Sequence, residues 1–133
     1  MNINELQIGN IFYRHCCNDR VVEIRKDGVI GLDNLRGIIP FNEIEPILIT
    51  KEFLLENGFE EKYEDITKSF YYEKDINNVY IMMSFLEYSN LGDDYFLFHV
   101  DNCDMDTIMR TYIKYIHQMQ NLLNIVGIED DLK

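Results

Sequence analysis

The pattern that most limits the fold is the helical repeat of residues 112–126. Its apolar side chains recur at spacings of three and four, and they are Tyr112, Ile116, Met119, Leu123 and Val126. The opposite face is polar and holds His117, Gln118, Gln120, Asn121 and Asn124. These spacings place each set on its own side of an α-helix, which Gly127 is suited to end. A two-faced helix must cover another apolar layer, so the rest of the chain has to supply one.

The first fifty residues contain four or five short β-rich runs. The runs are residues 11–14, 21–25, 29–32, 38–41 and 45–49. Between them we expect a turn at residues 18–20, a hairpin turn at Asp27–Gly28 and a loop at residues 33–37. Asp and Gly both tolerate the positive φ values of a two-residue type I′ turn. Short strands separated by turn signals predict a small, SH3-like, β-rich subdomain in residues 1–49.

In residues 50–59 the spacing of apolar residues changes from that of a strand to that of a helix. This segment predicts a short joining helix. Thr50 is a good N-cap because its side-chain oxygen can accept a bond from an unpaired amide of the first turn. Gly58 suits the position after the helix, which would span residues 51–57. The following residues 60–68 are rich in charge and are expected to form a mobile linker.

Residues 60–133 are predicted to form an antiparallel sheet covered by the C-terminal helix, which makes the fold class α+β. The strand-like runs are residues 69–73, 79–88 and 95–100, with a turn at residues 75–78. Residues 103–110 fit either a fourth strand or an early start of the helix. We favour a strand, with Thr111 as the helix N-cap. Residues 60–133 are expected to form either a separate part of the protein or one compact unit with residues 1–59.

The net charge is −12 and is unevenly spread. Residues 51–133 hold 17 acidic and 7 basic residues, whereas residues 1–50 hold 7 and 5. Nucleic-acid affinity comes largely from cations that neutralise phosphates, so residues 51–133 are not expected to bind nucleic acid. A weak nucleic-acid-binding module in residues 1–50 stays open as an alternative. Its cations would be Arg14, Arg20, Arg25, Lys26 and Arg36.

Three features predict a cytoplasmic protein. The N-terminus has neither the basic nor the apolar region of a secretory signal. No apolar run approaches the roughly 18 residues of a membrane span. The three cysteines, Cys16, Cys17 and Cys103, are odd in number and include an adjacent pair. That pattern is typical of free thiols in a reducing compartment rather than of a disulfide framework.

No metal site or cofactor is predicted. Adjacent cysteines lack the spacing of a zinc site, and distant residues could complete a ligand set only if the fold brings them close. The residues weighed for zinc are His15, Cys16, Cys17, His99 and Cys103. The run that holds Asp101, Asp104 and Asp106 lacks the glycine and the terminal glutamate of a calcium loop.

The candidate binding residues are His117, Gln118, Gln120 and Asn121 on the polar face of the C-terminal helix. An imidazole and several amides could recognise a polar ligand or partner. The favoured interpretation is structural, because buried amides and imidazoles that are fully bonded can fix a helix in place. Catalysis by His117 would need a nucleophile or a second acid–base group, and the sequence identifies none.

Residues 4–10 hold a Leu-x-Ile-Gly-Asn motif, residues 44–59 hold the run Pro-Ile-Leu-Ile-Thr before the short helix, and residues 113–129 form a third distinctive segment. These three segments resemble one family of small proteins from gut Bacteroidetes, their phages and mobile elements. The family has Pro-Ile-x-Leu-Thr in the middle segment, where this chain has Ile49 in place of Leu. The last segment is similar to the family's Tyr-Val-His-Gln-Leu-Gln-Asn-Leu ending, with Ile116 for Val and Met119 for Leu. The resemblance implies an architecture and an origin, and it carries no activity.

The expected function is that of a non-enzymatic interaction protein of a phage or mobile element. Its acidic C-terminal half would meet a protein partner, most simply a basic one. One alternative is a small-ligand binder or enzyme that uses His117 and Asn121, with Tyr115 as a further candidate.

Overall fold

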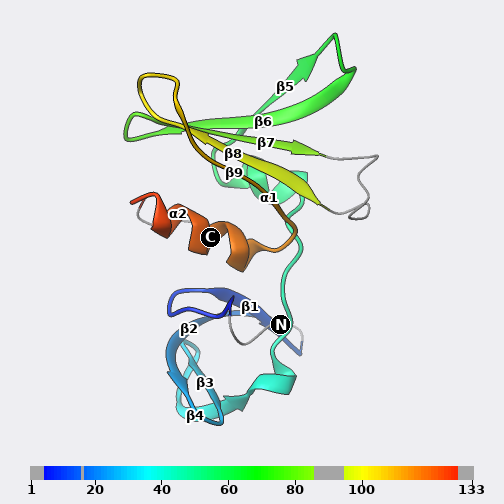
Figure 1. The fold of residues 1–133 in the computed structure, drawn as a ribbon. Coiled ribbons are helices and arrows are strands. Elements are labelled where there is room, and N and C mark those ends of the chain that lie inside the picture. Colours follow the sequence, from blue (N-terminus) through cyan, green and yellow to red (C-terminus); the bar gives the residue numbers. More distant parts are fainter. Residues whose placement is uncertain (1–4, 16, 86–94, 129–133) are drawn as a thin grey trace. The chain divides into compact units, whose positions relative to one another are not determined.

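The computed structural model describes residues 5–15, 17–85 and 95–128 and contains two antiparallel β-sheets and a C-terminal helix (Figure 1). This mostly β architecture with a helical component is compatible with the predicted α+β class. The chain divides into two compact units. One is Met1–Leu48 with Tyr115–Leu122, and the other is Ile49–Lys114 with Leu123–Lys133. Cys16, the end of the strand predicted at residues 79–88 and the loop that follows lie outside the described residues.

The first unit contains a four-stranded sheet whose strands follow one another in chain order. The strands are β1 (Ile11–Arg14), β2 (Cys17–Arg25), β3 (Gly28–Gly31) and β4 (Asn34–Pro40), followed by the 3-10 turn η2 (Phe41–Glu43). Every neighbouring pair is antiparallel. Apolar side chains from these strands and their flanks form one buried cluster. Its members are Leu6, Phe12, Val21, Val29, Ile39 and Ile44.

Four predictions for the first unit are wrong in detail. Residues 45–49 do not form a strand and make only isolated bridges, from Glu45 to Tyr13 and from Leu48 to Tyr115. Asn18 and Asp19 pair with β1 and so belong to a strand rather than a turn. The loop expected at residues 33–37 falls largely within β4, because Asn34 already pairs with Gly31. The β2–β3 hairpin exists, but Arg25 pairs with Gly28, so its two loop residues are 26 and 27. Gly28 is a strand residue without a positive φ.

The helix predicted at residues 51–57 is confirmed as α1 (Lys51–Glu56), and its role in joining two halves stays a prediction. Thr50 is its N-cap, and the hydroxyl oxygen accepts a bond from the amide of Phe53 at 3.1 Å. Gly58 has φ +86°, which L side chains rarely adopt, and it lets the chain leave the helix. The amide of Phe59 then donates to the carbonyl of Leu54 at 3.0 Å, so the end of the helix is bonded as the sequence predicts.

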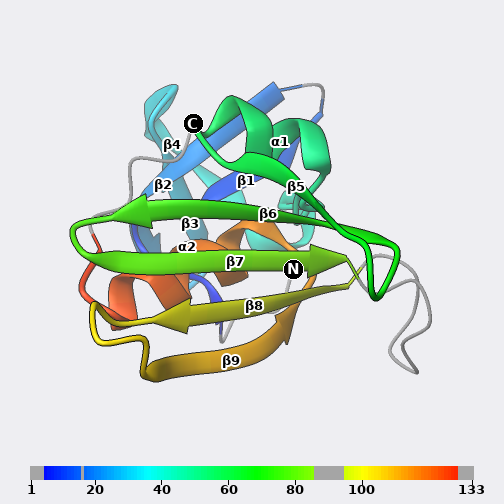
Figure 2. The ribbon, with the colours of Figure 1, turned by 90° about the horizontal axis from the view of Figure 1, so that it is seen from above.

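The second unit contains a five-stranded antiparallel sheet, again in chain order (Figure 2). The strands are β5 (Glu60–Glu64), β6 (Ser69–Ile76), β7 (Val79–Phe85), β8 (Phe96–Asp101) and β9 (Thr107–Ile113). Its buried face carries a cross-strand row in which Tyr72 pairs with Met83, and Met83 with Phe98. The prediction of an antiparallel sheet in this half of the chain is confirmed.

The prediction of a linker at residues 60–68 is wrong, because the first five of these residues form β5. All five are exposed, yet each pairs in register with a residue of β6. A charged segment can form an edge strand when the ladder to its neighbour satisfies its backbone. The turn predicted at residues 75–78 narrows to Asn77 and Asn78, which both have positive φ values. Ile76 pairs with Val79, so this turn is a two-residue hairpin.

The C-terminal helix begins later than predicted. Residues 112 and 113 lie in β9, where Tyr112 pairs with Leu97, and α2 spans Ile116–Ile125. Thr111 pairs with Phe98, so it is a strand residue and not the N-cap. Tyr112 fits both the alternation of a strand and the three-to-four spacing of a helix. The sequence pattern alone therefore places the start of the helix too early. The stop is confirmed at Gly127, which has φ +82°. That α2 covers the second sheet stays a prediction.

Two tyrosines of the second sheet make stability sensitive to alkaline pH. Burial, aided by the hydrogen bond to Glu61, raises the pKa of Tyr72 to about 12. Burial likewise raises the pKa of Tyr80, whose hydroxyl donates to Glu73. In the unfolded chain a tyrosine loses its proton near pH 10, so between about pH 10 and 12 the folded chain holds more protons. Stability should therefore fall as pH rises through this window.

Denaturant unfolding at pH values from about 9 to 12 checks this expectation. Tyr72→Phe removes one ionising hydroxyl and should make the loss of stability less steep, and Tyr72→Phe with Tyr80→Phe should do so further. Equal slopes in the parent protein and the double variant would contradict the assignment.

Candidate functional site

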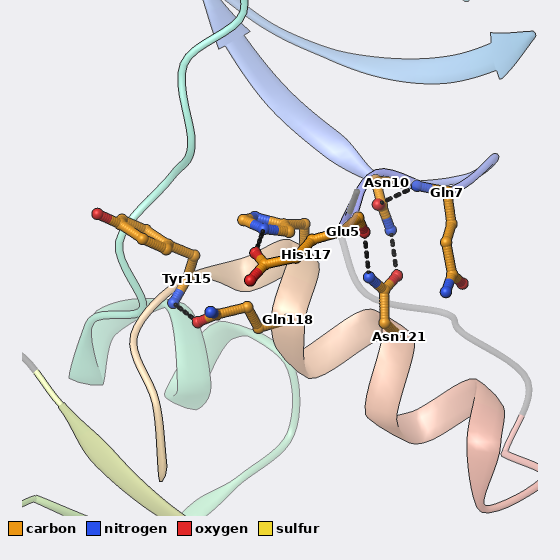
Figure 3. Close-up of polar contacts among 7 residues, drawn as sticks. All are labelled: Glu5, Gln7, Asn10, Tyr115, His117, Gln118 and Asn121. Carbon is orange, nitrogen blue, oxygen red and sulfur yellow. Dashed lines mark hydrogen bonds and ion pairs between the residues drawn. The ribbon is translucent and has the colours of Figure 1, made fainter. Parts of the chain in front are cut away.

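Three of the four polar side chains predicted as binding residues, His117, Gln120 and Asn121, lie against residues 5–11 in the first unit (Figure 3). His117 and Gln120 are fully buried, and Gln118 and Asn121 are partly buried. Residues 116–122 of α2 belong to this unit. The helix therefore presents amides and an imidazole to the chain that leads into β1.

Gln120 uses both ends of its amide on the backbone of that segment. Its Oε1 accepts a bond from the amide of Ile11 at 2.9 Å, and its Nε2 donates to the carbonyl of Gly9 at 3.1 Å. The side chain thus takes the place that a neighbouring strand would occupy at the start of β1. Because an unbonded buried amide or carbonyl is costly, these two bonds hold the helix and the strand in register.

Asn121 and Asn10 form the second contact. The Nδ2 of Asn10 donates to Oδ1 of Asn121 at 2.8 Å, and Nδ2 of Asn121 donates to the carbonyl of Glu5. Asn10 is itself buried, and its Oδ1 accepts a bond from the amide of Gln7 at 2.7 Å. One asparagine side chain therefore closes a local turn and also contacts the helix.

His117 forms the third contact, through Nε2 and the carboxylate of Glu5 at 2.9 Å. Its ring stacks on Tyr115 with centroids 5.7 Å apart. The Nδ1 atom is buried and has no hydrogen-bond partner among the described residues. A general base must reach the proton that it removes, and a ring enclosed in this way is not placed to touch a substrate. The geometry agrees with the structural interpretation of His117.

Gln118 has a local role at the start of the helix. Its Oε1 accepts a bond from the backbone amide of Tyr115 at 3.0 Å. Tyr115 directly precedes α2, so Gln118 reaches back from the third helical position as in a capping box. A ligand-binding role for His117, Gln118, Gln120 and Asn121 stays a prediction, and the bonds described above are all within the chain.

The contact joins two segments that lie far apart in the sequence. Residues 6–10 and 115–122 carry the opening and closing motifs of the family resemblance, and they bond to each other. The sequence pattern does not identify Glu5, Gly9 and Asn10 as partners of the helix. Gly9 has φ +94°, and its carbonyl accepts bonds from both Gln120 and Arg20.

The other residues weighed for metal binding do not converge. Within residues 5–15, 17–85 and 95–128, no group of three or more His, Cys, Asp or Glu could hold a metal ion. Cys17 and Cys103 are both exposed. Asp101 contacts His99 at 2.7 Å. The amides of Asp104 and Asp106 instead bond the side chain of Asn102, which shapes the turn between β8 and β9.

Several cations considered for nucleic-acid binding are engaged within the first unit. Arg14 lies 2.8 Å from Glu43, and Arg25 lies 2.9 Å from Glu23. The guanidinium of Arg20 donates to the carbonyl of Gly9 at 2.9 Å. These contacts partly neutralise the residues that would have to meet phosphates, so the geometry adds no support to a nucleic-acid interface.

In the described part of the chain, neither α1 nor α2 has the length and apolar character needed to cross a membrane. Comparisons of the sequence with protein-family models and with curated proteins, and of the fold with solved structures, find no match.

Proposed function

We propose that the chain is a non-enzymatic interaction protein of a phage or mobile element, and that its acidic second half binds a basic protein partner. The observation that carries the proposal is the exposed charge of β5. Three of its five residues are glutamates, and all five residues are exposed. They lie in a half of the chain with 17 acidic and 7 basic residues. Like-signed surface charge attracts partners of opposite sign and speeds their association.

The candidate chemical residues support the non-enzymatic part of the proposal. His117, Gln120 and Asn121 form hydrogen bonds to the chain leading into β1. Both the oxygen and the nitrogen of the Gln120 side-chain amide take part in these bonds. The phage or mobile-element origin rests on the family resemblance alone. An exposed free thiol at Cys103 fits the cytoplasm, where cysteines stay reduced.

We also propose that the first unit is an SH3-like module. A small antiparallel sheet in chain order, with a 3-10 turn after its last strand, supports this proposal. Such a module would add a second surface for peptides or proteins, by analogy of fold.

Affinity capture at graded salt concentrations tests the proposal. The immobilised full-length chain is incubated with a lysate of a gut Bacteroidetes host, and bound proteins are identified at low and at high ionic strength. We expect basic proteins that are lost as salt rises, because salt screens exposed charge pairs. Capture that is independent of salt, or confined to acidic proteins, would refute the electrostatic role. A gel shift with duplex DNA at low salt tests the alternative that residues 1–50 bind nucleic acid.

A further inference from the structure

Strand β5 is a terminal strand of the second sheet. It pairs with β6 on one side, and within the described residues no strand pairs with its other side. A terminal strand offers backbone donors and acceptors to any extended chain that lies beside it. All five residues of β5 are exposed, so other described segments do not cover this strand.

Apolar side chains accompany this free edge. Tyr63 of β5 lies directly opposite Phe70 of β6, and their rings are 5.1 Å apart. Both remain about half exposed, at 50% and 51%, and Ile66 in the connecting turn is 90% exposed. Aromatic side chains grouped on an exposed surface are typical of protein-interaction sites.

The charge of β5 determines which kind of partner segment it would attract. Glu60, Glu61 and Glu64 outnumber Lys62, whose ammonium already lies 3.4 Å from Glu60. The opposite terminal strand, β9, has Arg110 as its one charged residue. A cationic segment would therefore be attracted to β5 in preference to β9.

We propose that β5 binds an extended segment of a partner protein in which basic and apolar residues alternate, and that this segment adds a sixth strand to the sheet. The inference rests on the proposed function and specifies its surface and partner. Backbone bonds would hold the segment, its apolar side chains would meet Tyr63 and Phe70, and its basic side chains would meet the glutamates. A second copy of this chain fits less well, because pairing two β5 strands would bring glutamates close to one another.

The probe is a fluorescently labelled ten-residue peptide of alternating lysine and valine, and its anisotropy is followed as full-length protein is added. We expect saturable binding. Glu60→Gln with Glu64→Gln should weaken it about five- to tenfold, since two exposed charge pairs are lost. The matched control is Asp27→Asn with Asp33→Asn, which changes the net charge equally but lies on exposed sites of the first unit. It should change the affinity less than about twofold.

Two further comparisons separate strand addition from charge attraction alone. A peptide of the same sequence methylated at every backbone nitrogen keeps its charge but cannot donate to the edge, and it should not bind. Tyr63→Ser with Phe70→Ser should abolish binding, whereas Tyr112→Ser, at a side chain of 52% exposure in β9, should not. Thermal melting of each variant establishes that it is folded.

Equal binding of the methylated peptide would overturn strand addition, as would an equal effect of the two charge variants. Absence of any peptide binding would also overturn the inference. The proposed function fails separately, if salt-sensitive capture of basic proteins by the full chain is not seen.

Discussion

Gln120→Ala should lower the free energy of unfolding by about 1–3 kcal/mol, because it leaves a buried backbone amide without a partner. This is the amide of Ile11, 2.9 Å from Oε1 in the parent protein. The carbonyl of Gly9 loses its bond from Nε2 at 3.1 Å but keeps the bond from the guanidinium of Arg20. An orphaned group costs about 1–3 kcal/mol when water cannot replace the lost bond. Urea denaturation followed by circular dichroism measures the change.

Asn124→Ala is the matched control for this variant. Asn124 lies on the same helix but is exposed, so removing its amide should change stability by no more than about 0.5 kcal/mol. Gln120→Met keeps the approximate length of the side chain and removes only its polar atoms. It should be nearly as destabilising as Gln120→Ala. A small effect of both Gln120 variants would mean that the helix is not held to the start of β1 by these bonds.

The polar face of the helix could be predicted, but its partners could not. Spacings of three and four place His117, Gln120 and Asn121 on one side of any helix, whatever surrounds it. Which backbone they meet depends on a contact between residues more than a hundred positions apart, such as Gln120 and Ile11. No local pattern encodes that pairing. The glycine at position 9 is a weak signal, since it shows only that the chain adopts a special conformation there.

Strands with continuous apolar runs can be predicted from the sequence, whereas polar strands that depend on pairing with a neighbour cannot. The apolar runs of β1 and β8 were recognised from composition. Strand β5 was missed because its sequence is four-fifths charged, and its strand character comes from the ladder to β6. Edge strands often carry charged side chains, which discourage unwanted pairing with other chains, so composition alone assigns such strands to loops.

Phe98→Ala should be the most destabilising single substitution considered, at about 3–5 kcal/mol. Phe98 is fully buried on β8, between Met83 of β7 and Thr111 of β9 in the cross-strand register. Removing the ring loses apolar burial and leaves a cavity that its neighbours fill only in part. Urea denaturation at neutral pH, or expression and thermal melting if the variant is too unstable, measures the loss.

Phe70→Ala provides the comparison within the same sheet. Phe70 lies on the same face two positions before the buried Tyr72, but half of it is exposed and its main neighbour is the equally exposed Tyr63. Its loss should cost about 1 kcal/mol or less. A cost close to that of Phe98→Ala would assign Phe70 to the core and remove the reason to consider it part of a binding edge. A small cost would mean that this ring contributes little to holding the sheet together, which leaves its exposed surface available to a partner strand beside β5.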